Sequence, residues 1–172
     1  MAEAADYSAA EVLRDGRRVE IRAIRPADRD GLLAAVGRTS PDSLYRRFFS
    51  MRRSFSEREI AGFLDVDFAD RVALVAVVGE GDQAEIAGGG RYAVIGPGAA
   101  EVAFTVVDRY QGQGIGAALL RHLVAIARRA GLRELVAEVL AGNAAMLKVL
   151  RKSGLPQDLE HGSGVVHVTL RL

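Results

Sequence analysis

The chain has 172 residues, of which 49% are hydrophobic, and its 23 lysine and arginine residues nearly balance 22 aspartate and glutamate residues. That length fits one compact domain, and the balance of charge excludes a strong overall attraction to nucleic acid or to anionic membranes. Cysteine is absent from the sequence, which excludes disulfide bonds, a thiolate nucleophile and thiolate metal sites and is typical of cytoplasmic proteins. We therefore expect a cytoplasmic protein whose chemistry uses no cysteine sulfur.

The sequence also argues against a metal site and against a targeting segment. His122, His161 and His167 lack the spacing of metal ligands, so we expect no metal. The N-terminus lacks the positive leader and apolar core of a signal peptide, and no run approaches the roughly 18 apolar residues that span a bilayer. We interpret residues 1–16 as an N-terminal extension and residues 17–172 as a single domain.

The first half of the chain predicts one strand followed by three helices. Apolar and charged residues alternate over residues 19–23, which indicates a half-buried strand that stops at Pro26. A short helix to about residue 36 follows, and a second is expected from residues 40–42 through Phe49. A capping-box pattern over residues 56–59 predicts the start of a third helix.

The second half predicts an antiparallel meander followed by alternating helices and strands. Residues 72–78, 85–95 and 101–107 are strand-like, with three consecutive glycines inside the second of these segments. After them we expect a helix over residues 115–130, a strand over 135–140, a helix from Asn143 through Lys152 and a strand over 165–170. This order predicts an α/β sandwich with a mixed central sheet of six to seven strands and helices on both faces.

Alternating glycines stand between the strand over residues 101–107 and the helix that follows. This turn has the sequence Gln-Gly-Gln-Gly-Ile-Gly, residues 111–116. Because glycine lacks a side chain, a ligand can approach the main chain closely, and a helix N-terminus adds about half a positive charge. The turn therefore predicts a phosphate cradle, and a pyrophosphate is the expected occupant.

Three other interpretations of the turn were weighed. A P-loop is excluded because Ala117 and Ala118 stand where a lysine and a hydroxyl residue are required. A dinucleotide fold fits the fingerprint through Gly112, Gly114 and Ala117, with Glu138 as the acidic residue for the ribose, but four residues, 108–111, separate the first glycine from the strand. A plain turn is the third alternative, although such a turn rarely needs three alternating glycines.

Two blocks of sequence resemble a known family. Residues 111–116 are similar to the Arg/Gln-x-x-Gly-x-Gly/Ala signature of the GNAT acetyltransferases, and residues 143–155 are similar to that family's second conserved block. The stretches 24–28 and 43–49 further resemble the catalytic domain of bacterial protein lysine acetyltransferases that act on acyl-CoA synthetases. We expect this chain to lack the additional regulatory domain that many of those proteins carry.

The resemblance implies that the turn binds acetyl-CoA, with the pyrophosphate on the main chain and the pantetheine arm along the splayed end of the strand. Pantetheine amides suit unpaired strand backbone, much as an added strand would. Asn143 is expected to reach toward the pantetheine or to cap its helix. The predicted cofactor-binding residues are Val106, Val107, Gln111, Gly112, Gln113, Gly114, Ile115, Gly116, Ala117 and Asn143.

Glu101 is the predicted catalytic residue. A lysine amine with a pKa near 10.4 is almost wholly protonated at neutral pH, a deficit of roughly 4.6 kcal/mol, so a general base or a water linked to one is wanted. Glu101 begins the strand that leads into the turn, and the resemblance implies a glutamate on this strand. Many relatives have a tyrosine in the second block to protonate the departing thiolate, but Leu150 stands at that position here.

The resemblance thus implies an acetyl-CoA-dependent N-acetyltransferase that acts on an amine, and the expected acceptor is a lysine side chain of a protein such as an acyl-CoA synthetase. Without a cysteine, direct transfer in a ternary complex is expected. A small amine or amino acid is the alternative acceptor. A catalytically weak CoA-binding sensor or interaction module is the alternative from another functional class.

Overall fold

The computed structural model describes residues 2–48 and 55–172. The helices are α1 (Ala2–Ala5), α2 (Arg29–Gly37), α3 (Pro41–Phe48), α4 (Glu57–Leu64), α5 (Ile115–Arg129) and α6 (Ala144–Lys152), with 3-10 turns η1 (Pro26–Asp28), η2 (Gly81–Gln83) and η3 (Asp108–Tyr110). The strands are β1 (Ser8–Val12), β2 (Arg18–Ala23), β3 (Arg71–Val78), β4 (Glu85–Gly96), β5 (Ala99–Val106), β6 (Glu134–Leu140), β7 (Gln157–His161) and β8 (Val165–Arg171).

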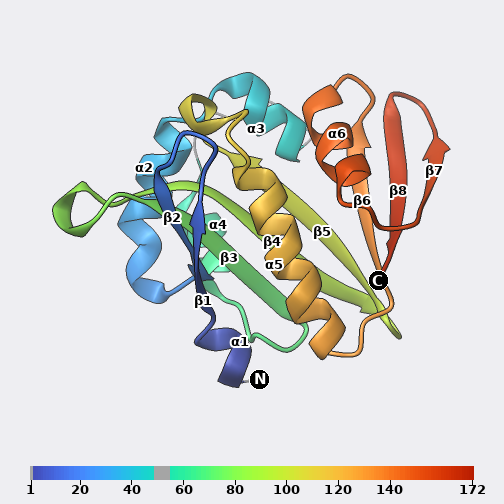
Figure 1. Cartoon of the computed structure of the whole chain (residues 1–172), viewed down its shortest axis with the longest axis horizontal. Coiled ribbons are helices and arrows are strands. Elements are labelled where there is room, and N and C mark those ends of the chain that lie inside the picture. Colours follow the sequence, from blue (N-terminus) through green and yellow to red (C-terminus); the bar gives the residue numbers. More distant parts are fainter. Residues whose placement is uncertain (1, 49–54) are drawn as a thin grey trace.

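Eight strands of the described residues form one mixed sheet in the order β1-β2-β3-β4-β5-β6-β8-β7 (Figure 1). Neighbours are antiparallel except for β5 and β6, which run parallel because α5 connects them. The expected meander of β3, β4 and β5 is confirmed by the antiparallel registers of these strands. The sheet opens between these two parallel strands, β5 and β6, and the candidate site lies at this opening.

Helix α5 packs across the middle of the sheet, over β4 in particular (Figure 1). Its buried positions include Ile115, Leu119, Leu123 and Ala127, at the helical spacing that the sequence predicts. The glycines inside β4 follow from this packing, because a Cβ at Gly90 would lie 3.1 Å from Leu123 Cδ1 and 2.8 Å from Phe104 Cδ1. The close approach of helix and sheet fixes where the N-terminus of α5 lies.

The expected α/β sandwich with helices around a mixed sheet is confirmed, with one more strand than the upper limit of six to seven. The two strands that the sequence analysis did not identify are β1, which lies inside the expected N-terminal extension, and β7. Both occupy the edges of the sheet, and β7 is mostly exposed, so neither has the alternating apolar pattern of a half-buried strand. Phe49, the expected end of the second helix, lies outside the described residues.

Hydrogen-bonded side chains hold the N-terminal segment against α5. Tyr7 Oη bonds to His122 Nδ1, and His122 Nε2 lies 2.7 Å from Glu11 Oε1. Arg121 Nη2 donates to the same Glu11 oxygen at 3.0 Å. His122 therefore has partners on both ring nitrogens, and residues before position 17 take part in the fold.

The motif over residues 24–28 is structural in this protein. Asp28 is 8% exposed and accepts two hydrogen bonds from the Arg22 guanidinium, at 2.7 and 2.8 Å, and one from the Arg25 main-chain N–H at 2.7 Å. Burial alone would raise the pKa of Asp28, but these donors outweigh it and hold the pKa below its usual range. The carboxylate ties β2 to the start of α2.

No helix in the described part of the chain is long and apolar enough to cross a membrane.

Candidate active site

A cleft opens between β5 and β6. The two strands pair only from Ala99 opposite Glu134 to Glu101 opposite Val136. Beyond that point β5 continues to Val106 and β6 to Leu140, and among the described residues neither has a strand partner on the facing edge. The cleft has a volume of about 360 Å³, and backbone groups along its walls are free to bind an extended ligand.

The N-terminus of α5 closes one end of this cleft. Gly114 is the N-cap, with φ of 96° and ψ of 4°, and no described side chain caps the helix. The first amide engaged in the helix is that of Ala118, which donates to the Gly114 carbonyl at 3.0 Å. The N–H groups of Ile115, Gly116 and Ala117 are thus available to an anion, and these three residues line the cleft.

The side chains of the two glutamines stabilise the turn through hydrogen bonds to neighbouring residues. Gln111 Nε2 donates to Ser43 Oγ at 3.1 Å and to the Val106 carbonyl at 3.0 Å. Gln113 Nε2 donates to the Arg109 carbonyl at 3.1 Å, and its Oε1 accepts from Arg17. Gln111 and Gly112 line the cleft, whereas the Gln113 side chain supports the turn from behind.

The two valines at the end of β5 differ in position. Val106 lines the cleft, as expected for a residue in contact with pantetheine. Val107 lines a second cavity instead, and its main chain is engaged, since its N–H donates to the Ala87 carbonyl at 2.8 Å and its carbonyl accepts from Tyr110 at 2.8 Å. A main-chain contact from Val107 to a ligand would have to compete with these bonds.

Asn143 lies at the mouth of the cleft and caps α6. Its Oδ1 accepts a hydrogen bond from the Met146 N–H at 3.2 Å, which confirms the predicted capping role. The Asn143 side chain also lines the cleft. Its amide N–H₂ group therefore lies at a position from which it can donate to a ligand.

Basic side chains dominate the polar lining of the cleft. Within the described part of the chain, the cleft is lined by one acidic residue, Glu138, and by the basic residues Arg14, Arg46, Arg47, Lys148 and Lys152. Such a lining favours an anionic ligand. Sequence analysis did not identify the lysines, although a signal was present: they are the only lysines in the sequence and stand one helical turn apart.

Glu101 lies at the vertex where β5 and β6 separate, as the last paired residue of β5. Its side chain is exposed and lies outside the lining of the cleft. Alternation along the strand places Glu101 on the same face as Ala103 and Thr105. The Glu101 carboxylate is also an electrostatic neighbour of Arg47, which lies at the end of α3.

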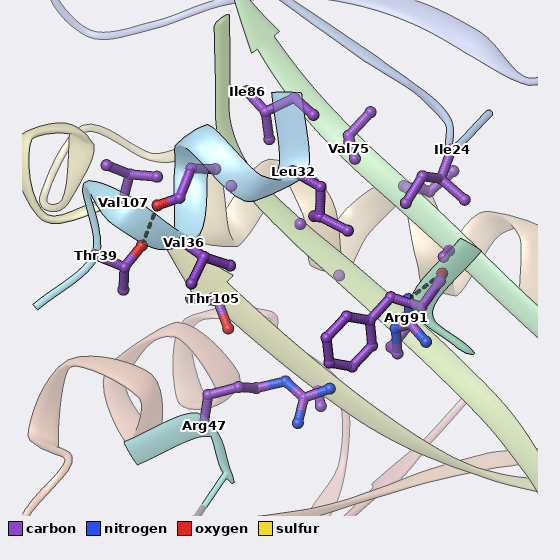
Figure 2. Close-up of a pocket in the computed structure, with 18 of the residues that line it drawn as sticks. Ile24, Leu32, Val36, Thr39, Arg47, Val75, Ile86, Arg91, Thr105 and Val107 are labelled. Atoms are coloured by element: carbon purple, nitrogen blue, oxygen red, sulfur yellow. Dashed lines mark hydrogen bonds between the residues drawn. The ribbon is translucent and has the colours of Figure 1, made fainter. Parts of the chain in front are cut away.

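A second cavity, of about 100 Å³, lies on the α2–α4 side of the sheet (Figure 2). Leu32 and Val36 of α2 line it together with the rings of Phe48, Phe55 and Phe63, which pack against one another with centroids 4.9 to 5.9 Å apart. Two arginines, Arg47 and Arg91, are its charged lining residues within the described part of the chain. Arg47, Ala103 and Thr105 line both this cavity and the cleft, so the two spaces adjoin.

Leu150 is 0% exposed and belongs to the hydrophobic core. It contributes no polar group to the cleft. Any proton that a departing thiolate receives must come from another group, and a thiol with an ordinary pKa near 8.5 leaves acceptably as its anion beside a positive lining.

These features define an α/β domain that binds an extended, phosphate-bearing ligand between two splayed strands, with the phosphates at the N-terminus of α5. Comparison with known proteins makes the class specific. The acetyltransferase (GNAT) family model matches residues 41–155, and the chain belongs to this family. It is an acetyl-CoA-dependent acetyltransferase, and the free amides, the splayed strand edges and the basic lining fit the pyrophosphate and pantetheine of acetyl-CoA.

Two curated relatives and one solved structure support this assignment. Acetyltransferase PA5475 of Pseudomonas aeruginosa is 34% identical over 160 residues, which cover 91% of this chain and 86% of that protein. Acetyltransferase Pat of Mycolicibacterium smegmatis is 37% identical over 145 residues, which cover 83% of this chain but only 42% of Pat. The crystal structure of the GNAT domain of S. lividans PAT matches with a TM-score of 0.87 and 37% identity, over 96% of this chain and 97% of that domain.

Proposed function

We propose that this acetyltransferase modifies the side-chain amine of a protein lysine, by direct transfer within a ternary complex. The observation that carries the proposal is the position of Glu101, at the vertex of the cleft and on the face of β5 that borders the second cavity. Ala103, two residues further along the same face of β5, lines both the cleft and the second cavity, so a carboxylate at position 101 lies next to both spaces along the strand. Similarity to Pat and to the GNAT domain of PAT supports the same class of reaction.

In this mechanism the N-terminal amides of α5 hold the pyrophosphate, and the free edges of β5 and β6 orient the pantetheine arm. The acceptor approaches from the side of α3 and α4. Glu101 receives the ammonium proton, directly or through one water, so that the neutral amine attacks the thioester carbonyl carbon. The C–N bond then forms as the C–S bond breaks, the CoA thiolate leaves, and the second proton that the nitrogen loses passes to that thiolate or to solvent. The chain contains no cysteine, so no acetyl-cysteine intermediate can form.

An acceptor screen tests the proposal. Release of free thiol from acetyl-CoA is measured with an acyl-CoA synthetase, with lysine-containing peptides and with a panel of small amines and amino acids. We expect thiol release with the protein or peptide acceptors. Double-reciprocal plots of the initial rate should give intersecting lines, as for a ternary complex. Release with small amines alone would assign a small-molecule acetyltransferase, and a stable acetyl-enzyme would contradict direct transfer.

The CoA-binding sensor gives a different result in the same screen. Buried Leu150 in place of the family's tyrosine is the observation that favours it. A sensor would bind CoA tightly, as measured by thermal shift, but release no thiol with any acceptor. Thiol release with any acceptor therefore separates the enzyme from the sensor.

A further inference from the structure

The second cavity combines apolar walls with two cationic side chains. Figure 2 shows the Arg47 side chain extending from α3 across the cavity toward Arg91, which comes from the opposite wall, on β4. Burial and the neighbouring Arg91 cation lower the pKa of Arg47 to about 10, with Glu101 acting in the opposite direction. Burial and Arg71 lower the pKa of Arg91 as well. Both groups remain charged at neutral pH, at a cost in desolvation and repulsion.

Neither arginine has a carboxylate partner among the residues that the structure describes. Arg91 Nη2 donates to the Phe63 carbonyl at 2.7 Å and its guanidinium lies 5.3 Å from the Phe63 ring centroid. Arg47 lies 4.5 Å from the centroid of Phe48. Among residues 2–48 and 55–172, no carboxylate oxygen comes within 4.0 Å of either guanidinium. The sequence over residues 49–54 contains no aspartate or glutamate that could supply one.

Buried arginines are ordinarily paired with carboxylates or phosphates, because an arginine presents five N–H donors in a planar fork. Arg22, paired with Asp28, is the matching case within this chain. Arg47 and Arg91 keep most of their donors for a group that enters the cavity. A volume of about 100 Å³ suits a small anionic group rather than a phosphate-bearing cofactor.

We propose that Arg47 and Arg91 form a carboxylate-binding subsite, which selects acceptors that carry a carboxylate close to the amine. This inference rests on the proposed function, since it assigns a substrate class to the acceptor side of the same site. The carboxylate lies between the guanidinium groups of Arg47 and Arg91, and the amine projects past Ala103 and Thr105 into the cleft, because these two residues line both spaces. The carboxylate is either the α-carboxylate of an amino acid or an acidic side chain beside the target lysine.

The test uses two matched acceptor pairs that differ only in one negative charge. The first pair is lysine and lysinamide. The second is the blocked dipeptides acetyl-Lys-Glu-amide and acetyl-Lys-Gln-amide. Dissociation constants are measured by titration calorimetry on the CoA-bound protein, which cannot react, and kcat/KM is measured by thiol release from acetyl-CoA.

We expect the carboxylate member of at least one pair to bind about tenfold more tightly, as for charge-assisted hydrogen bonds. Arg91→Met should reduce that ratio to near one while the affinity for CoA is unchanged, and Arg91→Lys should leave part of it. Arg71→Met is the matched control, because Arg71 is an exposed, charged neighbour of Arg91 at the start of the otherwise mostly buried β3 and lies outside the cavity. The pair that shows the preference identifies the source of the carboxylate.

Equal affinity within both pairs for the wild-type protein would overturn the subsite, as would a preference that survives Arg91→Met. If Arg71→Met lost the preference to the same extent, the preference would come from the overall positive charge of this region rather than from Arg47 and Arg91. That result would also overturn the subsite. Thermal unfolding of each variant shows whether it folds, and Arg91→Lys provides the readout if Arg91→Met does not. A carboxylate preference in binding without thiol release from any acceptor would leave the subsite standing and contradict the proposed function instead.

Discussion

Alanine substitutions at Gly114 and Gly116 distinguish two requirements of the turn. One is its backbone conformation, and the other is the space that the missing side chain leaves. Gly114 has φ of 96°, a region that alanine enters at a cost of about 1 to 2 kcal/mol. A Cβ there would meet nothing within 4 Å, so the cost is one of backbone conformation alone. Gly116 is helical, and its added Cβ would lie 3.7 Å from Val149 Cγ2, an ordinary contact.

Gly114→Ala should therefore lower the unfolding temperature by about 2 to 8 °C for a chain of this length. It should also weaken acetyl-CoA binding by about tenfold or more, because relaxing the N-cap turns the amides of residues 115–117 away from the cleft. Gly116→Ala should leave the unfolding temperature equal or slightly higher, since alanine favours helix by about 1 kcal/mol over glycine, and should keep acetyl-CoA affinity within about threefold.

Thermal unfolding and equilibrium titration of acetyl-CoA check both variants. If Gly114→Ala lost stability as expected but bound acetyl-CoA with wild-type affinity, the helix N-terminus would not be the pyrophosphate site. If Gly116→Ala alone abolished binding, the site would depend on space at the first turn of α5 rather than on the conformation of Gly114.

Three further predictions follow from the same structure. Glu101→Gln should lower turnover about 10²- to 10⁴-fold with acetyl-CoA affinity unchanged, while the exposed control Glu80→Gln has no effect; near-normal turnover of Glu101→Gln between about pH 7 and 9 would contradict the role of Glu101. Lys148→Gln with Lys152→Gln should weaken CoA binding and reduce its dependence on salt, whereas Arg151→Gln, on the same helix but outside the cleft, should change neither. Asp28→Asn should lower the free energy of unfolding by about 3 kcal/mol at neutral pH. Because the folded state lowers the pKa of Asp28, that contribution is present above its usual pKa and disappears as the pH falls through the lower folded value. Urea titrations should therefore show the two proteins converging as the pH falls below the usual range of an aspartate; an unchanged difference would refute the assignment.

The donor half of the site could be predicted because it is built from the main chain. A main-chain site can be recognised in the sequence by glycines, which mark positions where a side chain must be absent, and by residues that cap a helix. Gly114 marks the turn, and Asn143 marks the start of α6. The helical spacing of apolar residues after the turn fixes the length of α5, and the meander before it fixes the strand that leads in. These signals are local, so one sequence is enough to identify them.

The edges of the sheet could not be predicted in the same way. β1 is stabilised by its pairing with β2 and by the contact of Tyr7 with His122, which lies 115 residues further along the chain. β7 depends on its pairing with β8. A strand whose side chains are mostly exposed on both faces has no apolar period, so its stability lies in long-range hydrogen bonds that the local sequence does not display.

The acceptor half depends on side chains that come together from distant segments. In the sequence, Arg91 is a single charged residue within the strand-like segment over residues 85–95, and no local pattern marks it as a cavity residue. In the structure, α2 and α4 cover the face of β4 that carries Arg91. Arg91 lines a cavity because of this packing. Arg47 ends an amphipathic helix whose other charges are exposed, and only the packing of α3 against β5 brings it to the border of the cleft. In this proposal, the helices that precede the meander set the specificity for the acceptor, while β5 and α5 bind the acetyl-CoA common to the family. This division explains how one donor site can serve many acceptors, since α2 and α4 can change their side chains without disturbing the glycine turn or the separation of β5 from β6, whereas α3 is tied to the turn through Ser43 and Gln111.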